Sequence, residues 1–197
     1  NRVAIIFQNV SAVYSFKKEK FYELKNSLIL SALTLPGAII GAVTAVSISD
    51  DLFEKILGVI MIFIIITMLL PKKNSDKTVS DFTIDWKIVI AMIVIGFYGA
   101  FLQVGVGFLL MAAFQYLMNL DLIRVNMHKV FVVFVFTIPA LIIFILTDNI
   151  NWYYGLTLSA GNAFGGWWGA KLSVKKGEKL IKSVLIIAIL IMSFKLL

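Results

Sequence analysis

The sequence lacks cysteine altogether and is poor in charged residues and histidine. Among its 197 residues there is no cysteine and one histidine, and Asp, Glu, Lys and Arg together make up 15%. The absence of cysteine excludes disulfides and thiolate chemistry. The apolar segments also contain no HExxH, no GxSxG, no Cys/His cluster, no paired carboxylates and no phosphate-binding glycine loop. We therefore expect no enzymatic activity, no metal site and no cofactor.

Hydrophobic residues are abundant instead. They make up 60% of the chain, and the mean hydropathy is +0.96. A helix that crosses a bilayer needs about 20 mostly apolar residues. Residues 1–16 look like the inner part of one such segment, and six more reach or approach this length: 26–47, 52–70, 86–104, 125–147, 152–170 and 179–197. We therefore predict an all-α polytopic integral membrane protein whose surroundings are the lipid bilayer.

The formal net charge of +7 comes from lysines placed at the ends of the apolar segments. This placement is typical of charges that set membrane topology, so we expect no nucleic-acid partner. Loops rich in Lys and Arg stay on the cytoplasmic side. The rule predicts that 17–25, the polar linker 71–85 and 171–182 lie inside, and that the turns 48–55 and 147–151 lie outside.

Two parts of the sequence resemble each other at a fixed spacing. GAIIGA recurs as GGWWGA, and EKILGVIMI recurs as EKLIKSVLII, each about 125 residues later. Corresponding loops are predicted on opposite sides, which is the pattern of inverted-topology repeats. We predict a first repeat over 1–70, a cytoplasmic linker over 71–85 and a second repeat over 86–197. On the same period, about 40 residues of the first repeat are expected to precede Asn1.

A glycine-rich stretch interrupts the second repeat. GFYGAFLQVGVGFLL, residues 96–110, contains four glycines and a glutamine. Both the linker 71–85 and Arg124 are predicted inside, so the chain between them has to enter and leave on the same side. We predict a re-entrant helical hairpin broken near Gln103 to Gly107, lined by protein or a water-filled cavity because lipid does not tolerate open backbone. For Gly96 and Gly99, close helix packing is an equal alternative.

The break predicts an anion site. A helix that starts inside the protein presents free N–H groups and the positive end of its dipole, which together suit an anion. We assign the N–H groups from Gly105 through Gly107 to Phe108 to this site, with the amide of Gln103 beside them.

The next helix predicts a cation for the same site. Asn126 and Lys129 are three residues apart and so share one face. Lys129 corresponds to Ala4 in the first repeat, so the charge is not symmetrical, as expected where one ligand binds. The alternative is a topology lysine that reaches back to the membrane surface. Asn1 is expected to belong to a matching half-site in the first repeat.

Three amides and the single histidine have less definite roles. Gln8, Asn9 and Asn162 either bond across a helix interface or line the cavity, and we include Asn162 in the predicted site. His128 is adjacent to Lys129 and so faces elsewhere, and we interpret it as a structural or interfacial group rather than a proton carrier.

These motifs together resemble a known family. GFYGAFLQVGVGFLL, then NMHK, then GLTLSAGNAFGGWWGAKLSVKKGEK are similar to the second half of the sulfite exporter TauE/SafE family of toluenesulfonate-type permeases. The resemblance covers 85 to about 189 well and 1–70 more loosely. It implies a multi-pass permease of the bacterial inner membrane that exports sulfite, sulfonates or related small anions by alternating access. The alternatives are a passive anion channel and a membrane assembly protein without transport, and a homodimer is left open.

Overall fold

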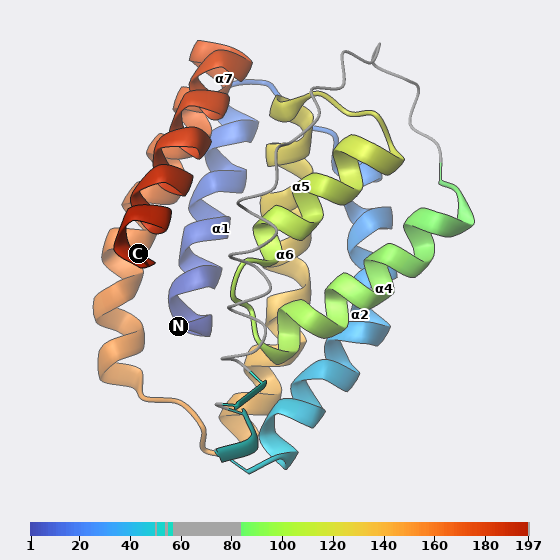
Figure 1. Ribbon diagram of the computed structural model, residues 1–197, viewed down its shortest axis with the longest axis vertical. Coiled ribbons are helices and arrows are strands. Elements are labelled where there is room, and N and C mark those ends of the chain that lie inside the picture. The colour runs from blue at the N-terminus through green and yellow to red at the C-terminus, as the bar shows by residue number, and fades with distance from the viewer. Residues whose placement is uncertain (50, 54, 57–83, 197) are drawn as a thin grey trace.

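The computed structural model describes residues 1–49, 51–53, 55–56 and 84–196, with side chains as far as Gly177. Every regular element in these ranges is a helix, which confirms the all-α prediction. The predicted span 52–70 and the linker 71–85 lie largely outside the described residues. The helices, labelled in Figure 1, are α1 (Arg2–Lys18), α2 (Leu24–Ser47), α4 (Trp86–Phe101), α5 (Val106–Leu117), α6 (Leu122–Leu146) and α7 (Trp152–Leu196).

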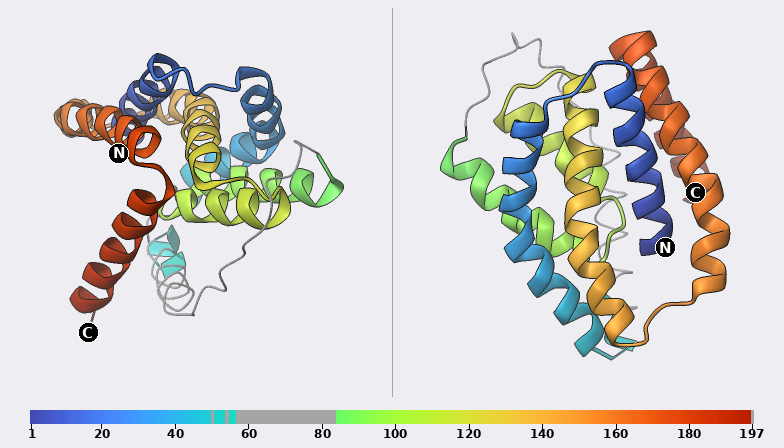
Figure 2. Two further views of the ribbon diagram at one scale, coloured as in Figure 1. Left: turned by 90° about the horizontal axis from the view of Figure 1, so that it is seen from above. Right: turned by 180° about the vertical axis from the view of Figure 1, so that it is seen from behind.

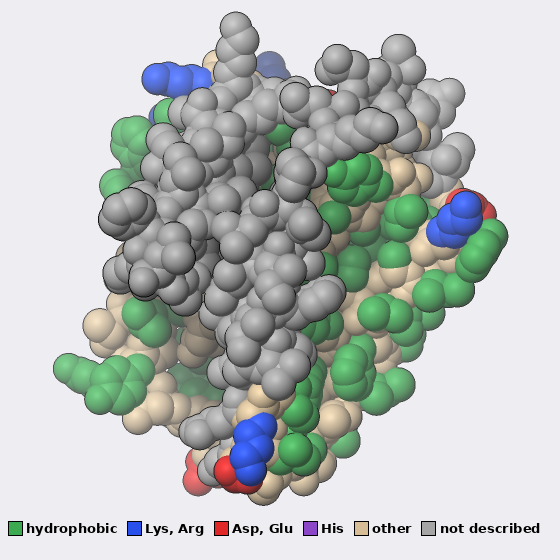
Figure 3. Space-filling model, viewed as in Figure 1, with side chains coloured by type: hydrophobic (Ala, Val, Ile, Leu, Met, Phe, Trp, Pro, Cys, Tyr) green, Lys and Arg blue, Asp and Glu red, His purple; other side chains and the backbone are tan. Residues whose placement is uncertain are grey.

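Two helices are long and apolar enough to cross a membrane. Among the described residues, α2 and α6 pass this test of length and composition. Their outward faces keep large apolar side chains exposed, such as Ile40 at 59% and Leu146 at 80%. Figure 3 shows further hydrophobic side chains covering the face that α4 presents. An apolar surface this extensive suits lipid rather than water.

Glycine allows α2 and α4 to cross at close range. A Cβ added to Gly37 would overlap the carbonyl oxygen of Ile93, and one added to Gly41 would overlap that of Phe97. From the other side, a Cβ on Gly96 would overlap the carbonyl oxygen of Thr34. Small residues at a helix crossing are the usual device for close packing in bilayers. The packing alternative is therefore the correct one for Gly96.

Helix α6 is the centre of the assembly, since it contacts each of the other described helices. On one side of it, α1 packs against α7, and on the other α2 packs against α4 (Figures 1 and 2). In Figure 1, α1 and the first part of α7 run upward, whereas α2 and α6 run downward. The lysine-rich end of α1 and the start of α6 thus lie at the same end of the bundle.

Helix α7 is broken at Gly177. Gly177 has φ 66° and ψ −163°, a conformation that essentially only glycine adopts without strain. This residue lies between the predicted segments 152–170 and 179–197, so the chain separates them with a glycine and not with a loop.

Two predicted helix boundaries are wrong by a few residues. Helix α6 begins at Leu122 instead of 125, because the carboxylate of Asp121 accepts hydrogen bonds from the backbone N–H groups of Ile123 and Arg124 at 3.0 and 2.9 Å. Such a cap starts a helix at once. Helix α4 ends at Phe101 instead of 104, because the backbone turns into the left-handed region two residues later.

Candidate functional site

The helical break predicted in the glycine-rich stretch is present between α4 and α5. Gln103 and Gly105 have φ values of 66° and 71°, which end the helical path. The hydroxyl of Tyr98 donates a hydrogen bond to the carbonyl of Val104 at 2.5 Å and so fixes the linking segment. The four residues from 102 to 105 therefore form an ordered corner that joins two helices.

The corner presents fewer free amides than the sequence predicted. The N–H of Phe108 donates to the carbonyl of Gly105 at 2.9 Å, so Phe108 is not an available donor and its assignment is wrong. The chain tightens its first helical turn in this way, as helix ends commonly do. The start of α5 still carries the amides of Val106 and Gly107 at the positive end of the helix dipole.

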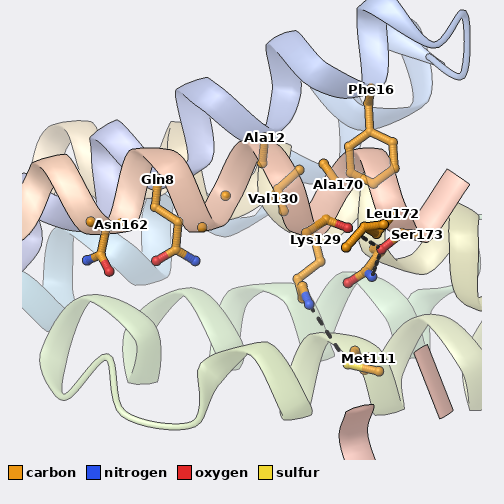
Figure 4. A pocket seen from close by; sticks show the side chains of 15 residues that line it. Gln8, Ala12, Phe16, Met111, Lys129, Val130, Asn162, Ala170, Leu172 and Ser173 are labelled. Carbon is orange, nitrogen blue, oxygen red and sulfur yellow. Dashed lines mark hydrogen bonds between the residues drawn. The ribbon is translucent and has the colours of Figure 1, made fainter. Parts of the chain in front are cut away.

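A cavity of about 570 Å³ lies between α1, α6 and the first part of α7, with Met111 of α5 facing it (Figure 4). Its volume is typical of sites for small molecules. The polar side chains that line it are Gln8, Asn126, Lys129, Asn162 and Ser173. Three of the predicted site residues, Asn126, Lys129 and Asn162, are thus brought together, and Gln8 and Asn162 take the cavity-lining role.

Lys129 is the charged group of this cavity. Figure 4 shows its side chain reaching from α6 towards α5, where Nζ lies 4.0 Å from Sδ of Met111. None of the ion pairs found among the described residues includes Lys129. A sulfur atom is a weak acceptor and does not offset a positive charge. Within the described part of the chain, the cavity therefore presents a cation without an ionic partner.

Hydrogen bonds beside Lys129 link two of the helices that line the cavity. Asn126 donates through Nδ2 to Oγ of Ser173 at 3.2 Å, and that hydroxyl donates to the carbonyl of Gly169 at 2.8 Å. These two hydrogen bonds join α6 to α7 beside the cavity. On the side of α5, a Cβ added to Gly107 would lie 3.6 Å from Cδ of Lys129. This is an ordinary van der Waals distance, so the lysine stem lies against the start of α5 without requiring glycine at position 107.

Gly165 and Gly169 of α7 do not form, with any described helix, close contacts of the kind that Gly37 and Gly41 form in α2. A Cβ on Gly165 or Gly169 would meet no described residue within 4 Å, and both residues line the cavity. Gly37 and Gly41 therefore form packing contacts, whereas Gly165 and Gly169 form none within the described part of the chain. The physical reason is that α4 covers the glycines of α2, whereas no described helix covers those of α7.

His128 faces away from the cavity and is fully buried. Its Nδ1 lies 2.9 Å from Oγ of Ser27, and its Nε2 lies 3.6 Å from a carboxylate oxygen of Glu23. Glu23 also pairs with Arg124 at 3.3 Å. These contacts join the start of α2 to the start of α6, which fits the structural role predicted for His128.

Two predicted site residues lie in a different cavity. Gln103 and Asn1 line a space of about 390 Å³ near the first turn of α1, the end of α4 and the turn before α7. The prediction that Gln103 shares one site with Lys129 is therefore wrong, whereas the half-site expected around Asn1 stays a prediction. The left-handed turn at Gln103 directs the chain around the corner, so Gln103 lines the second cavity whereas Gly107, four residues later, lies near the side chain of Lys129.

The second cavity also contains Arg2, which the sequence did not place. Its Nη2 donates to the carbonyl of Ala100 at 2.6 Å, and its guanidinium lies over the ring of Phe144, 4.0 Å from the centroid. Arg2 thus caps the last carbonyls of α4, where a cation is favoured by the helix dipole. The sequence could have indicated this role for Arg2, because a helix that ends inside the protein needs a group that pairs with its last carbonyls.

Comparison with known proteins gives a consistent result over the whole chain. The family model described as sulfite exporter TauE/SafE matches residues 1–196. A probable membrane transporter protein, ORF9 of a Sinorhizobium species, is 25% identical over 198 residues, which cover 100% of this chain and 76% of the relative.

Two further relatives carry similar names. The probable membrane transporter protein YfcA of Escherichia coli strain K12 is 27% identical over 199 residues, covering 100% of this chain and 74% of YfcA. YunE of Bacillus subtilis strain 168, also named a probable membrane transporter protein, is 24% identical over 211 residues, covering 98% of this chain and 77% of YunE. No solved structure matches the chain.

Proposed function

The chain belongs to the sulfite exporter TauE/SafE family, a family of membrane transporters, and we propose that it is a secondary transporter that exports small sulfur oxyanions such as sulfite and sulfonates. The proposal places it as a multi-pass protein in the bacterial inner membrane. The observation that carries it is Lys129, a cation without an ionic partner among the described residues, in a cavity large enough for a small anion.

The neutral groups around Lys129 suit an oxyanion. Asn126, Asn162 and Gln8 supply amide N–H donors, and the start of α5 beside Gly107 contributes the positive end of a helix dipole. The oxygens of sulfite or of a sulfonate group accept several hydrogen bonds at once. A single lysine with neutral donors binds such an anion without holding it so tightly that it cannot leave.

The helix directions support inverted repeats. On the spacing of the repeat, α1 corresponds to α6 and α2 to the first part of α7. The members of each pair run in opposite directions in Figure 1, and the packing of α1 on α7 has its counterpart in the packing of α6 on α2. We propose that α4 and α5 form a re-entrant hairpin, and that one repeat rocks against the other to give alternating access.

The topology can be tested because the chain contains no cysteine. We expect single cysteines at Asp51 and Asn149 to react with a membrane-impermeant maleimide added to intact cells with a permeable outer membrane. A cysteine at Lys18 should react only after the inner membrane is opened. All three positions are exposed, so burial does not confound the result. Labelling of all three from the same side would contradict the inverted topology.

Transport itself is measured with radiolabelled sulfite in proteoliposomes. We expect uptake that saturates with concentration and is accelerated by sulfite on the opposite side, because a single site has to return before it binds again. A passive anion channel would give uptake that rises linearly without such acceleration. A membrane assembly protein would give no uptake above that of empty liposomes. Either of these outcomes would refute the proposal.

A further inference from the structure

The second cavity contains two buried hydrogen-bond donors that lack acceptors. Nη1 of Arg2 and Nε2 of Gln103 are both buried without a hydrogen-bond partner among the described residues. Gln103 is only 8% exposed, and both residues line the space of about 390 Å³. Buried donors are almost always paired in native proteins, and an exception requires an explanation.

Arg2 is held so that only part of its donor set is used. Nη2 is fixed by the carbonyl of Ala100, and the ring of Phe144 supports the face of the guanidinium. No ion pair among the described residues includes Arg2. The guanidinium is therefore positioned in advance, while among the described residues its charge is offset only by backbone carbonyls and an aromatic ring. Arginine in such a setting is suited to planar recognition of oxyanions.

We infer that Arg2 and Gln103 form a second binding subsite for a small oxyanion, separate from the Lys129 cavity. The ligand would accept hydrogen bonds from Nη1 of Arg2 and Nε2 of Gln103 at the same time. The identity of the ligand as the exported anion rests on the proposed function, whereas the two unpaired donors do not depend on it.

The position of the subsite fits a path through the protein. Arg2 begins α1, whereas Ala12 and Phe16 near the other end of α1 line the first cavity. The corner between α4 and α5 lines the second cavity through Gln103, and Gly107 just after it lies near the side chain of Lys129, which lines the first. An anion that leaves Lys129 would pass this corner and meet Arg2 and Gln103 before release on the outer side.

The test is the number of radiolabelled sulfite ions bound by the purified protein in detergent. We expect two per chain in the parent protein. Gln103→Gly should lose one of them, or weaken it about ten- to a hundredfold, as expected when a hydrogen bond to a charged group is removed. Because Gln103 has φ 66°, glycine relieves backbone strain there, so damage to the fold would not explain the loss.

Three further variants complete the design. Arg2→Gln keeps an amide that can donate to Ala100 but removes the charge, and it should lose the same ion as Gln103→Gly. Arg124→Gln is the matched control at the Glu23 ion pair and should bind both ions. Lys129→Met should lose only the other ion. If Lys129→Met binds sulfite as the parent does, the proposed function is refuted, whereas the subsite at Arg2 and Gln103 is not.

Two results would overturn the subsite. One is binding of the same number of ions with the same affinity in the parent, Gln103→Gly and Arg2→Gln, which would leave Arg2 as a helix cap only. The other is occupancy of this cavity by phosphatidylglycerol that sulfite does not displace, because the donors would then hold a lipid phosphate and not the exported anion.

Discussion

Replacement of Lys129 by methionine is expected to abolish saturable sulfite transport. The lysine is the charged group of the cavity, so an anion there would lose its cation. Breaking a buried ion pair by removing one partner costs about 3–5 kcal/mol, which corresponds to a loss of affinity of about a hundred- to several-thousandfold. Methionine has a similar length and no charge, so the cavity keeps its shape.

The measurement is the concentration dependence of radiolabelled sulfite uptake in proteoliposomes, together with the melting temperature of each variant. Lys87→Met is the matched control, because Lys87 is exposed at the start of α4. We expect this control to transport as the parent does. The melting temperature of Lys129→Met should be unchanged or higher, since the substitution removes a charge that pairs with no acidic side chain of the described residues. Uptake by Lys129→Met equal to that of the parent would exclude Lys129 from the site.

Gly37→Ala is expected to destabilise the fold strongly. The added Cβ would overlap the carbonyl oxygen of Ile93 and crowd the backbone nitrogen of Phe97. These are backbone atoms, which cannot rotate aside as a flexible side chain can. Overpacking typically costs about 1–3 kcal/mol, and we expect Gly37→Ala at the upper end of this range, with α2 and α4 forced apart.

Gly165→Ala provides a control at the corresponding position of the other repeat. A Cβ there meets no atom of the described residues within 4 Å, and alanine is favoured over glycine in a helix by up to about 1 kcal/mol. Thermal unfolding of the two purified variants in the same detergent should therefore give opposite shifts. Equal shifts would show that the close approach of α2 to α4 does not control stability.

The sequence alone determined the features that depend on neighbouring residues. Runs of apolar residues predicted the long helices α2 and α6, and the left-handed corner at Gln103 and Gly105 follows from a local concentration of glycine. The spacing of Asn126 and Lys129 placed them on one face of α6, and the structure confirms that both line one cavity. Length, composition and helical period are local properties, so they can be read without the fold.

The tertiary structure alone decided which polar groups meet. It separated Gln103 and Asn1 from Lys129, occupied the amide of Phe108 within its own turn, and assigned Gly96 to packing. It also brought Arg2 to the end of α4, 98 positions away in the chain. The reason is that the crossing and rotation of helices determine which faces share a cavity, and these depend on contacts between residues far apart in the sequence.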